Sequence, residues 1–172
     1  MNKILTKPVL FKNLMHRDKR GLFFENFKKK KININFAFSA AAYSKKNVIR
    51  GLHFQLKKKQ TKFITLISGE IMDICVNLKK KSKNFGKIYY FKMKKGDSLL
   101  VPNFFAHGYE CLSNTCIVHY LIDEYRYKKN ENGIFYKDNN LKIKWKSKKP
   151  IISNRDKNLE SFSYFKKKHI TL

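Results

Sequence analysis

The feature that most constrains the fold is a succession of short apolar or alternating runs separated by turn signals. Between residues 34 and 125 these runs are INFAFSAAAYS, NVIRGLHFQL, TKFITLISGEIMDICVNL, GKIYYFKM, DSLLVPNFFAHGYECLS and CIVHYLIDEY. Gly69-Glu70, Lys95-Gly96-Asp97 and Ser113-Asn114 stand where tight connections are expected. Stretches with helical periodicity are scarce before residue 150. The pattern therefore predicts an all-β fold, a sandwich or a barrel.

The organisation of the chain predicts one domain over residues 1–172. This length suffices to bury a core, and we see no internal repeat or Pro/Ser-rich linker. The tail NRDKNLESFSYFKKKH has Asn154 or Asp156 as possible N-caps, followed by Leu159, Phe162 and Phe165 at helical spacing. A short terminal helix is therefore expected.

The net charge of +27 first suggests a nucleic-acid partner, because lysines that neutralise phosphates release counterions. Only five of the 39 basic residues are arginine, however, which leaves 34 lysines scattered along the chain. Arginine is the better fork for phosphates and base edges. We therefore expect lysines that fill solvated positions, and no nucleic-acid partner. A basic nucleic-acid-binding β-barrel remains the non-enzymatic alternative; it predicts aromatic residues among basic ones on one exposed face.

Cysteine usage and hydropathy predict a cytoplasmic protein without membrane insertion. Cys75, Cys111 and Cys116 are an odd number in apolar settings and form no C-x-x-C pair. This usage favours buried thiols in a reducing compartment. No apolar run approaches the roughly 18 residues that a membrane span needs, and the first residues do not read as a signal peptide.

The run VIRGLHFQ, residues 48–55, places Arg50 and His53 within a strand that otherwise reads as buried. A buried cation costs several kcal/mol unless it is paired. The two residues are therefore either satisfied structural groups or part of a strand that lines a cavity for a charged ligand.

A second histidine lies in GDSLLVPNFFAHGYEC. Gly96, Pro102 and His107 have the spacing of the second conserved motif of cupin barrels, with Phe104 in place of its glycine. A metal-binding cupin also needs two histidines one residue apart in its first motif, and RGLHFQ supplies one. Because a metal site normally requires three or four convergent ligands, we expect neither a metal nor another cofactor.

A metal-free cavity with histidine, lysine, tyrosine and aspartate can invert a carbon next to a ketone. Removing the proton needs a positioned base and stabilisation of the enolate oxygen. Inversion also needs a proton donor on the opposite face, and an aspartate can fix the tautomer of a histidine base. Composition alone does not bring these residues together.

The chain resembles the dTDP-4-dehydrorhamnose 3,5-epimerase family of cupin-fold nucleotide-sugar epimerases. RGLH and P-x-x-x-AHG together are highly specific, and the resemblance runs in family order from about residue 18 to 156. The other segments that carry it are DKRGLFFENF, QTKFITLISGEIMDICVNL, NFGK, VHYLIDEY, NENGIFYKDNNLKIKW and PIISNRD. The resemblance implies a cupin-like β-sandwich or jelly-roll barrel with short terminal helices, and a cofactor-independent isomerase.

The resemblance also implies a catalytic role for four residues. His53 in RGLHFQ corresponds to the general base, and Asp156 in SNRD to its paired aspartate. Lys62 in QTKF corresponds to the lysine that stabilises the enolate, and Tyr120 in VHYL to the acid on the opposite face. Tyr125 is the next candidate for the acid.

Six further residues are implied in substrate binding: Arg20, Phe23, Glu25, Arg50, His107 and Tyr125. The first three lie in the N-terminal segment, about residues 1–35, which in the family reaches a nucleotide site across a homodimer interface. Arg50 would then have a diphosphate as its counter-charge. Asp73 in IMDICV matches a further acid of the family, for which a structural role is equally open.

The predicted function is epimerisation at C3 and C5 of a nucleotide-linked 4-keto-6-deoxy sugar for a surface polysaccharide such as capsule or lipopolysaccharide. Phe38 and Ala40 stand where the family usually has a glutamine and an asparagine near the nucleotide. A guanosine-linked 4-keto hexose or heptose is therefore an alternative to thymidine. The sequence also leaves open a C3-only epimerase, a 3,4-ketoisomerase and a sugar-binding cupin without turnover.

Overall fold

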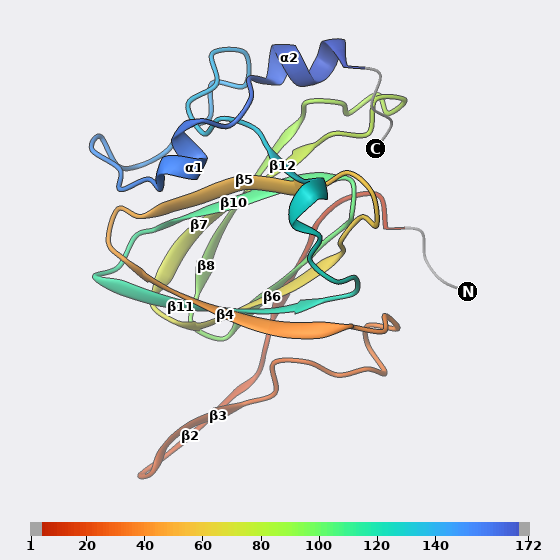
Figure 1. The fold of residues 1–172 in the computed structure, drawn as a ribbon. Coiled ribbons are helices and arrows are strands. Elements are labelled where there is room, and N and C mark those ends of the chain that lie inside the picture. The colour runs from red at the N-terminus through yellow and green to blue at the C-terminus, as the bar shows by residue number, and fades with distance from the viewer. Residues whose placement is uncertain (1–4, 169–172) are drawn as a thin grey trace.

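Two five-stranded antiparallel sheets packed face to face form the body of the protein in the computed structural model, which describes residues 5–168 (Figure 1). The first sheet has the order β1 (Val9–Lys12), β9 (Asp97–Val101), β6 (Lys62–Ser68), β11 (Thr115–Ile122), β4 (Phe38–Lys45). The second has the order β12 (Glu131–Gly133), β5 (Ile49–Gln55), β10 (Phe105–Cys111), β7 (Glu70–Asn77), β8 (Ile88–Lys94). The predicted all-β, cupin-like sandwich is confirmed.

The alternation of side chains along β7 shows how the sequence builds two cores. Ile71 and Cys75 point between the sheets and belong to the inner hydrophobic cluster. Ile74 and Val76 point the other way, because successive side chains of a strand face opposite sides. There they pack in an outer cluster with the C-terminal part of the chain, so both faces of the second sheet are covered.

The C-terminal part contains the short helices α1 (Asn154–Lys157) and α2 (Phe162–Lys167), and a 3-10 turn, η1 (Lys128–Asn130), precedes β12. Ser153 and Ser161 are the N-caps of α1 and α2. The expectation that Asn154 or Asp156 caps a helix was wrong, because the hydroxyl of Ser153 already accepts from the N–H of Asp156.

A separate hairpin, β2 (Met15–Asp18) and β3 (Gly21–Phe24), projects away from the sandwich (Figure 1). Every residue of β2 is exposed, and Phe23 on β3 is 66% exposed. Leu14 and Met15 at the start of the hairpin are also exposed.

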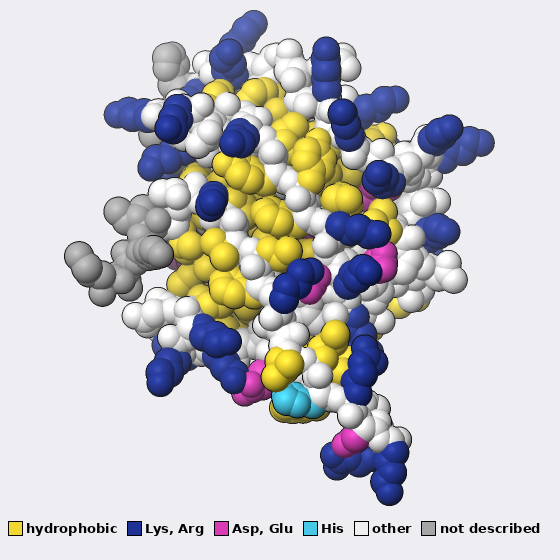
Figure 2. Space-filling model, turned by 180° about the vertical axis from the view of Figure 1, so that it is seen from behind, with side chains coloured by type: hydrophobic (Ala, Val, Ile, Leu, Met, Phe, Trp, Pro, Cys, Tyr) yellow, Lys and Arg dark blue, Asp and Glu magenta, His cyan; other side chains and the backbone are white. Residues whose placement is uncertain are grey.

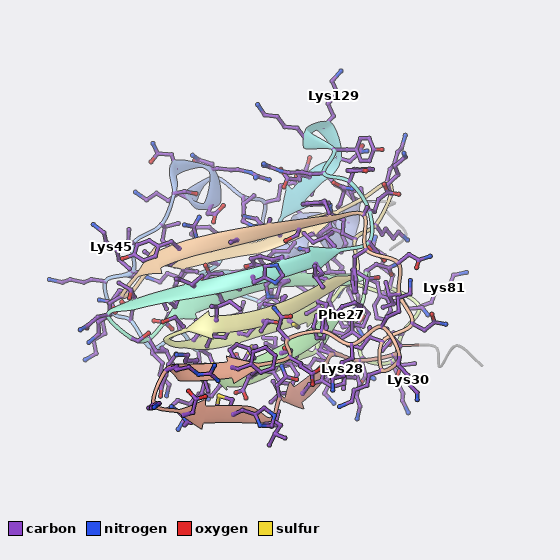
Figure 3. The ribbon with its side chains drawn as sticks, turned by 90° about the horizontal axis from the view of Figure 1, so that it is seen from below. Phe27, Lys28, Lys30, Lys45, Lys81 and Lys129 are labelled. Carbon is purple, nitrogen blue, oxygen red and sulfur yellow. The ribbon has the colours of Figure 1, made fainter. Side chains whose placement is uncertain are left out.

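Lysine and arginine side chains are spread widely over the face in Figure 2, with apolar side chains between them. Lys45, Lys81 and Lys129 extend outward from different sides of the sandwich in Figure 3. The predicted free thiols are confirmed, since Cys75, Cys111 and Cys116 are buried and unpaired with each other. Within residues 5–168, no helix has the length and apolar character needed to cross a membrane.

Candidate active site

A pocket of about 540 Å³ lies at the edge of the sandwich where β5, β10 and β12 of the second sheet approach β11 of the first. Its lining includes His53, His107, Tyr120 and Asp156. Residues separated by more than 100 positions in the sequence thus meet around one cavity.

Two glycines allow β5 and β10 to approach closely enough to form the pocket floor. A Cβ on Gly51, whose φ is +127°, would lie 2.6 Å from the Cα of Gly108. A Cβ on Gly108 would lie 2.6 Å from the carbonyl oxygen of Arg50. Because any side chain at either position would force the strands apart, these glycines hold His53 and His107 in register opposite each other.

His53 and Asp156 form a hydrogen-bonded pair at the pocket. Nε2 of His53 lies 2.8 Å from Oδ1 of Asp156, and the N–H of Gly51 donates to Oδ2 over 3.0 Å. Burial alone would raise the pKa of Asp156, but hydrogen bonds from His53, Gly51 and Ser153 and the charge of His53 lower it below its ordinary value. With Nε2 donating to this carboxylate, Nδ1 of His53 keeps the lone pair that a base needs.

His107 and Asp73 form a second pair of the same kind. Nε2 of His107 lies 2.7 Å from Oδ2 of Asp73, and the two side chains are 5% and 0% exposed. The thiol of Cys75 donates to the other oxygen of Asp73 over 3.6 Å. Asp73 therefore lies behind His107 and holds its ring, while His107 itself lines the pocket.

Tyr120 enters the pocket from β11, in the sheet opposite His53 and His107. Burial raises the pKa of its phenol well above the ordinary value. Its ring stands edge to face against His107 at a centroid distance of 6.3 Å. Tyr120 is therefore a protonated group that faces the histidines from the other sheet.

Lys62 on β6 extends from the first sheet toward His53 on the second. Its ammonium lies 3.4 Å from the carbonyl oxygen of His53, and burial lowers the pKa of this lysine. It is not among the side chains that line the pocket within residues 5–168. The structure thus brings the ammonium of Lys62 next to the main chain of His53, behind the residues that line the pocket.

Arg50 on β5 is hydrogen-bonded to the preceding strand β4. The sequence left two interpretations of Arg50 open, a satisfied structural group or a residue that lines a cavity. Arg50 is exposed and lines the pocket, while its neighbours Ile49 and Gly51 are buried. Its guanidinium donates to the Ser44 hydroxyl over 2.9 Å and to the Tyr43 carbonyl over 3.0 Å, both on β4. The cation is therefore hydrogen-bonded at the pocket and not enclosed in the core.

Three charged residues of the pocket were not predicted: Arg126, Glu131 and Arg155. Glu131 accepts two hydrogen bonds from Arg126, over 2.9 and 2.8 Å, and lies 3.1 Å from Arg155. The scarcity of arginine in a lysine-rich chain was the signal that could have identified two of them.

Tyr125 and Phe38 form a stacked pair with centroids 6.2 Å apart and an interplanar angle of 7°. Neither belongs to the pocket lining given by the described residues. Phe38 continues β4 two residues before Ala40, which pairs with Tyr120. The position where the family was expected to offer a hydrogen-bonding side chain is thus part of an aromatic stack.

The N-terminal residues predicted to bind substrate are not brought to this pocket within one chain. Arg20 pairs with Asp18 at 2.6 Å on the projecting hairpin, and Phe23 is exposed there (Figure 1). Glu25 pairs with Lys28 just after the hairpin.

No group of three or more His, Cys, Asp or Glu side chains gathers in a way that could hold a metal ion anywhere in the described range 5–168.

A family model described as dTDP-4-dehydrorhamnose 3,5-epimerase matches residues 3–164. The chain belongs to the dTDP-4-dehydrorhamnose 3,5-epimerase family. The dTDP-4-dehydrorhamnose 3,5-epimerase of Shigella flexneri is 31% identical over 174 residues, which cover 94% of this chain and 96% of the relative. The resemblance predicted from RGLH and P-x-x-x-AHG is therefore confirmed, and with it the class of enzyme, an isomerase.

Two solved dTDP-sugar 3,5-epimerases have the same fold. The Bacillus anthracis enzyme, with TDP and PPi bound, is 34% identical, has a TM-score of 0.86, and covers 94% of this chain and 97% of its own. The Legionella pneumophila dTDP-6-deoxy-D-glucose-3,5-epimerase, in complex with dTDP-4-keto-L-rhamnose, is 26% identical with a TM-score of 0.86, and the match covers 94% of this chain and 90% of that one.

Proposed function

We propose that this protein is a 3,5-epimerase that inverts C3 and C5 of a dTDP-linked 4-keto-6-deoxy sugar through enolate intermediates. The observation that carries the proposal is the arrangement of one pocket, with the His53–Asp156 pair on one sheet and a protonated Tyr120 on the other. The named activity of the relatives supplies the substrate class.

In the first step, Nδ1 of His53 takes the proton from C3, and the C–H electron pair moves into an enolate with its negative charge on the C4 oxygen. Asp156 stabilises the imidazolium that forms, because its carboxylate is ionised and hydrogen-bonded to Nε2. The ammonium of Lys62, which lies next to the carbonyl of His53, stabilises the enolate through its positive charge.

In the second step, Tyr120 donates its phenolic proton to C3 from the opposite face, and the electron pair returns to carbon. A phenol whose pKa is raised by burial stays protonated at neutral pH, so it is ready to donate. His53 then releases its proton to solvent and Tyr120 takes one up from solvent, so the same two steps at C5 can invert the second centre. Net inversion follows because donor and acceptor belong to facing sheets.

The proposed assembly is a homodimer in which the β2–β3 hairpin completes the partner's site. The hairpin projects from the sandwich and exposes Phe23 and Arg20 together. Mixing His53→Asn protomers with Phe23→Ala protomers tests this: a mixed dimer contains one site with both residues intact and should recover activity. An active monomer in sedimentation at assay concentration would contradict the assembly.

We further propose that the reaction takes place in the cytoplasm and that its product serves a surface polysaccharide. The three buried free cysteines support a reducing compartment. The nucleotide-activated sugar that the enzyme would modify supports a role in polysaccharide synthesis.

The experiment that tests the function is incubation in deuterium oxide with dTDP- and GDP-linked 4-keto sugars. We expect deuterium at C3 and C5 and inverted product from the dTDP sugar. Label at C3 alone would indicate a monoepimerase, and a carbonyl moved to C3 would indicate a ketoisomerase. Preference for the GDP sugar would show that Phe38 and Ala40 have changed the base specificity. No label with any sugar would overturn the proposal.

A further inference from the structure

The chain uses arginine in only two places. Of its 39 basic residues, five are arginine. Arg50, Arg126 and Arg155 line the pocket, whereas Arg17 and Arg20 line a hollow on the β2–β3 hairpin. Where a chain fills its solvated surface with lysine, arginine marks positions that need the planar fork of a guanidinium. That fork matches phosphate and carboxylate oxygens.

Glu131 holds two of these guanidinium groups at the pocket. Glu131 accepts two hydrogen bonds from Arg126 and forms an ion pair with Arg155. Burial alone would raise the pKa of Glu131, but the two arginines lower it below its ordinary value, so the carboxylate is ionised. The pair with Glu131 occupies two of the five N–H donors of Arg126, and its side chain is 59% exposed.

The charges that line the pocket leave an excess of positive charge. Three guanidinium groups, those of Arg50, Arg126 and Arg155, stand against the carboxylates of Glu131 and Asp156. An anionic ligand is therefore favoured, and the anionic part of the proposed substrate is its diphosphate.

One buried amide holds the main chain on both sides of Arg126. Oε1 of Gln55 accepts from the N–H of Tyr127 over 2.9 Å, and Nε2 donates to the carbonyl of Tyr125 over 3.1 Å. Nε2 also donates to the carbonyl of Lys58 over 2.6 Å. Because Gln55 is 1% exposed and lies two residues after His53 on β5, the strand that carries the proposed base also fixes the position of Arg126.

We propose that Arg126 binds the diphosphate of the substrate, and that Gln55 is the positioning residue that holds Arg126 at the pocket. This inference rests on the proposed function, because the diphosphate belongs to the proposed substrate.

The first test measures binding of dTDP, dTMP and thymidine by calorimetry to the full-length protein and to two variants. Arg126→Met should weaken dTDP binding about tenfold and thymidine binding less than about twofold, since charge-assisted hydrogen bonds are lost only to phosphate. Lys129→Met is the matched control, because Lys129 lies on the same segment and extends away from the sandwich (Figure 3). Equal effects of the two variants, or equal losses for dTDP and thymidine, would overturn the inference.

The second test asks whether Gln55 acts through Arg126. Gln55→Glu removes the donor to the carbonyls of Tyr125 and Lys58, and Gln55→Met removes all three hydrogen bonds without adding a charge. Each should weaken dTDP binding, raise KM and leave kcat within about twofold. When either Gln55 variant is combined with Arg126→Met, the further loss of dTDP affinity should be small. Both single variants weaken the same contact, that between Arg126 and the diphosphate.

Asp138→Asn is the control for a merely structural effect. This buried carboxylate accepts hydrogen bonds from the N–H groups of Asn140, Leu141 and Phe162, and it does not line the pocket. It should lower Tm without changing dTDP affinity. A full additive loss in the Gln55 and Arg126 double variant would overturn the positioning role. Because dTDP binding is measured without turnover, it is read independently of whether the epimerase reaction occurs.

Discussion

The molecule contains two histidine–aspartate pairs of nearly equal geometry on neighbouring strands, and they differ in their access to solvent. His53 and Asp156 lie 2.8 Å apart with side chains 28% and 6% exposed, whereas His107 and Asp73 lie 2.7 Å apart and are 5% and 0% exposed. A ring that exchanges a proton with a substrate needs a free nitrogen at the cavity. A ring that only orients a ligand can be enclosed.

The partners of the two pairs differ in the same way. Asp156 comes from α1, on the C-terminal part of the chain, and closes over β5. Asp73 comes from β7, the strand next to His107, and is held within the sheet. We therefore expect His53 and Asp156 to take part in proton transfer, and His107 and Asp73 to support the site structurally. The following variants test this difference in order of expected effect.

His53→Asn should cause the largest loss. It removes the proposed base while keeping a side chain that can bond to Asp156, so kcat should fall by about 10²–10⁴-fold with little change in Tm. Steady-state kinetics and thermal unfolding measure the two quantities. The matched His107→Asn should lower kcat less; a greater loss there would reverse the assignment of the pairs.

Tyr120→Phe should separate exchange from inversion. The ring that packs against His107 is kept and the hydroxyl is deleted, so His53 can still remove the proton. Inverted product should fall by about 10²-fold, while exchange of substrate hydrogen for solvent deuterium falls by less. Mass spectrometry and NMR follow the two rates. Equal losses would show that Tyr120 acts before the enolate forms, and normal inversion would transfer the acid role, with Tyr125 the next candidate.

Asp73→Ala should reduce stability more than catalysis. It leaves His107 without its partner in an enclosed position, so the free energy of unfolding should fall by about 2–3 kcal/mol, measured by urea denaturation. Glu70→Ala, which removes an exposed pair with Lys92, is the control and should change stability by less than about 1 kcal/mol. A stable Asp73→Ala protein with severely reduced kcat would give the enclosed pair a catalytic role.

The smallest effect should be the pH dependence of the contribution that Asp156 makes to the free energy of unfolding. Its folded pKa lies below its ordinary value of 3.8, so its ionised form stabilises the fold above that pH. This contribution is lost as the pH falls through the folded pKa. The difference in unfolding free energy between the wild type and Asp156→Asn should therefore be constant near neutral pH and shrink below about pH 4. A difference that grows toward acid would mean that the carboxylate is destabilised by the fold.

Sequence patterns predicted the parts of this site that depend on local chemistry. Strand alternation in β7 follows from the order of apolar residues, and RGLH with P-x-x-x-AHG identified the family. The predicted caps, Asn154 and Asp156, lie one and three residues after Ser153, the N-cap of α1. Ser153 and Asn154 are both good capping residues, and only the backbone conformation at Ser153 selects between them.

Sequence reasoning missed what depends on contacts between distant residues. The sequence left open whether Arg50 is a satisfied structural group or lines a cavity, and its hydrogen bond to Ser44 on β4 beside the pocket depends on tertiary structure. Glu131 had no distinguishing pattern, and its role as a holder of two arginines exists only because β12 pairs with β5.

The sequence by itself determined the class of fold, the family and the residue types available for proton transfer, because period-two alternation and short motifs are local properties of a chain. Both histidines line the pocket, and tertiary structure alone decided how far each is exposed there, since both lie beside apolar residues in the sequence. Their partners, Asp156 and Asp73, stand 103 and 34 positions away. Solvent access is set by which segment covers a strand, and α1 leaves His53 open while β7 and the facing sheet enclose His107 and its aspartate.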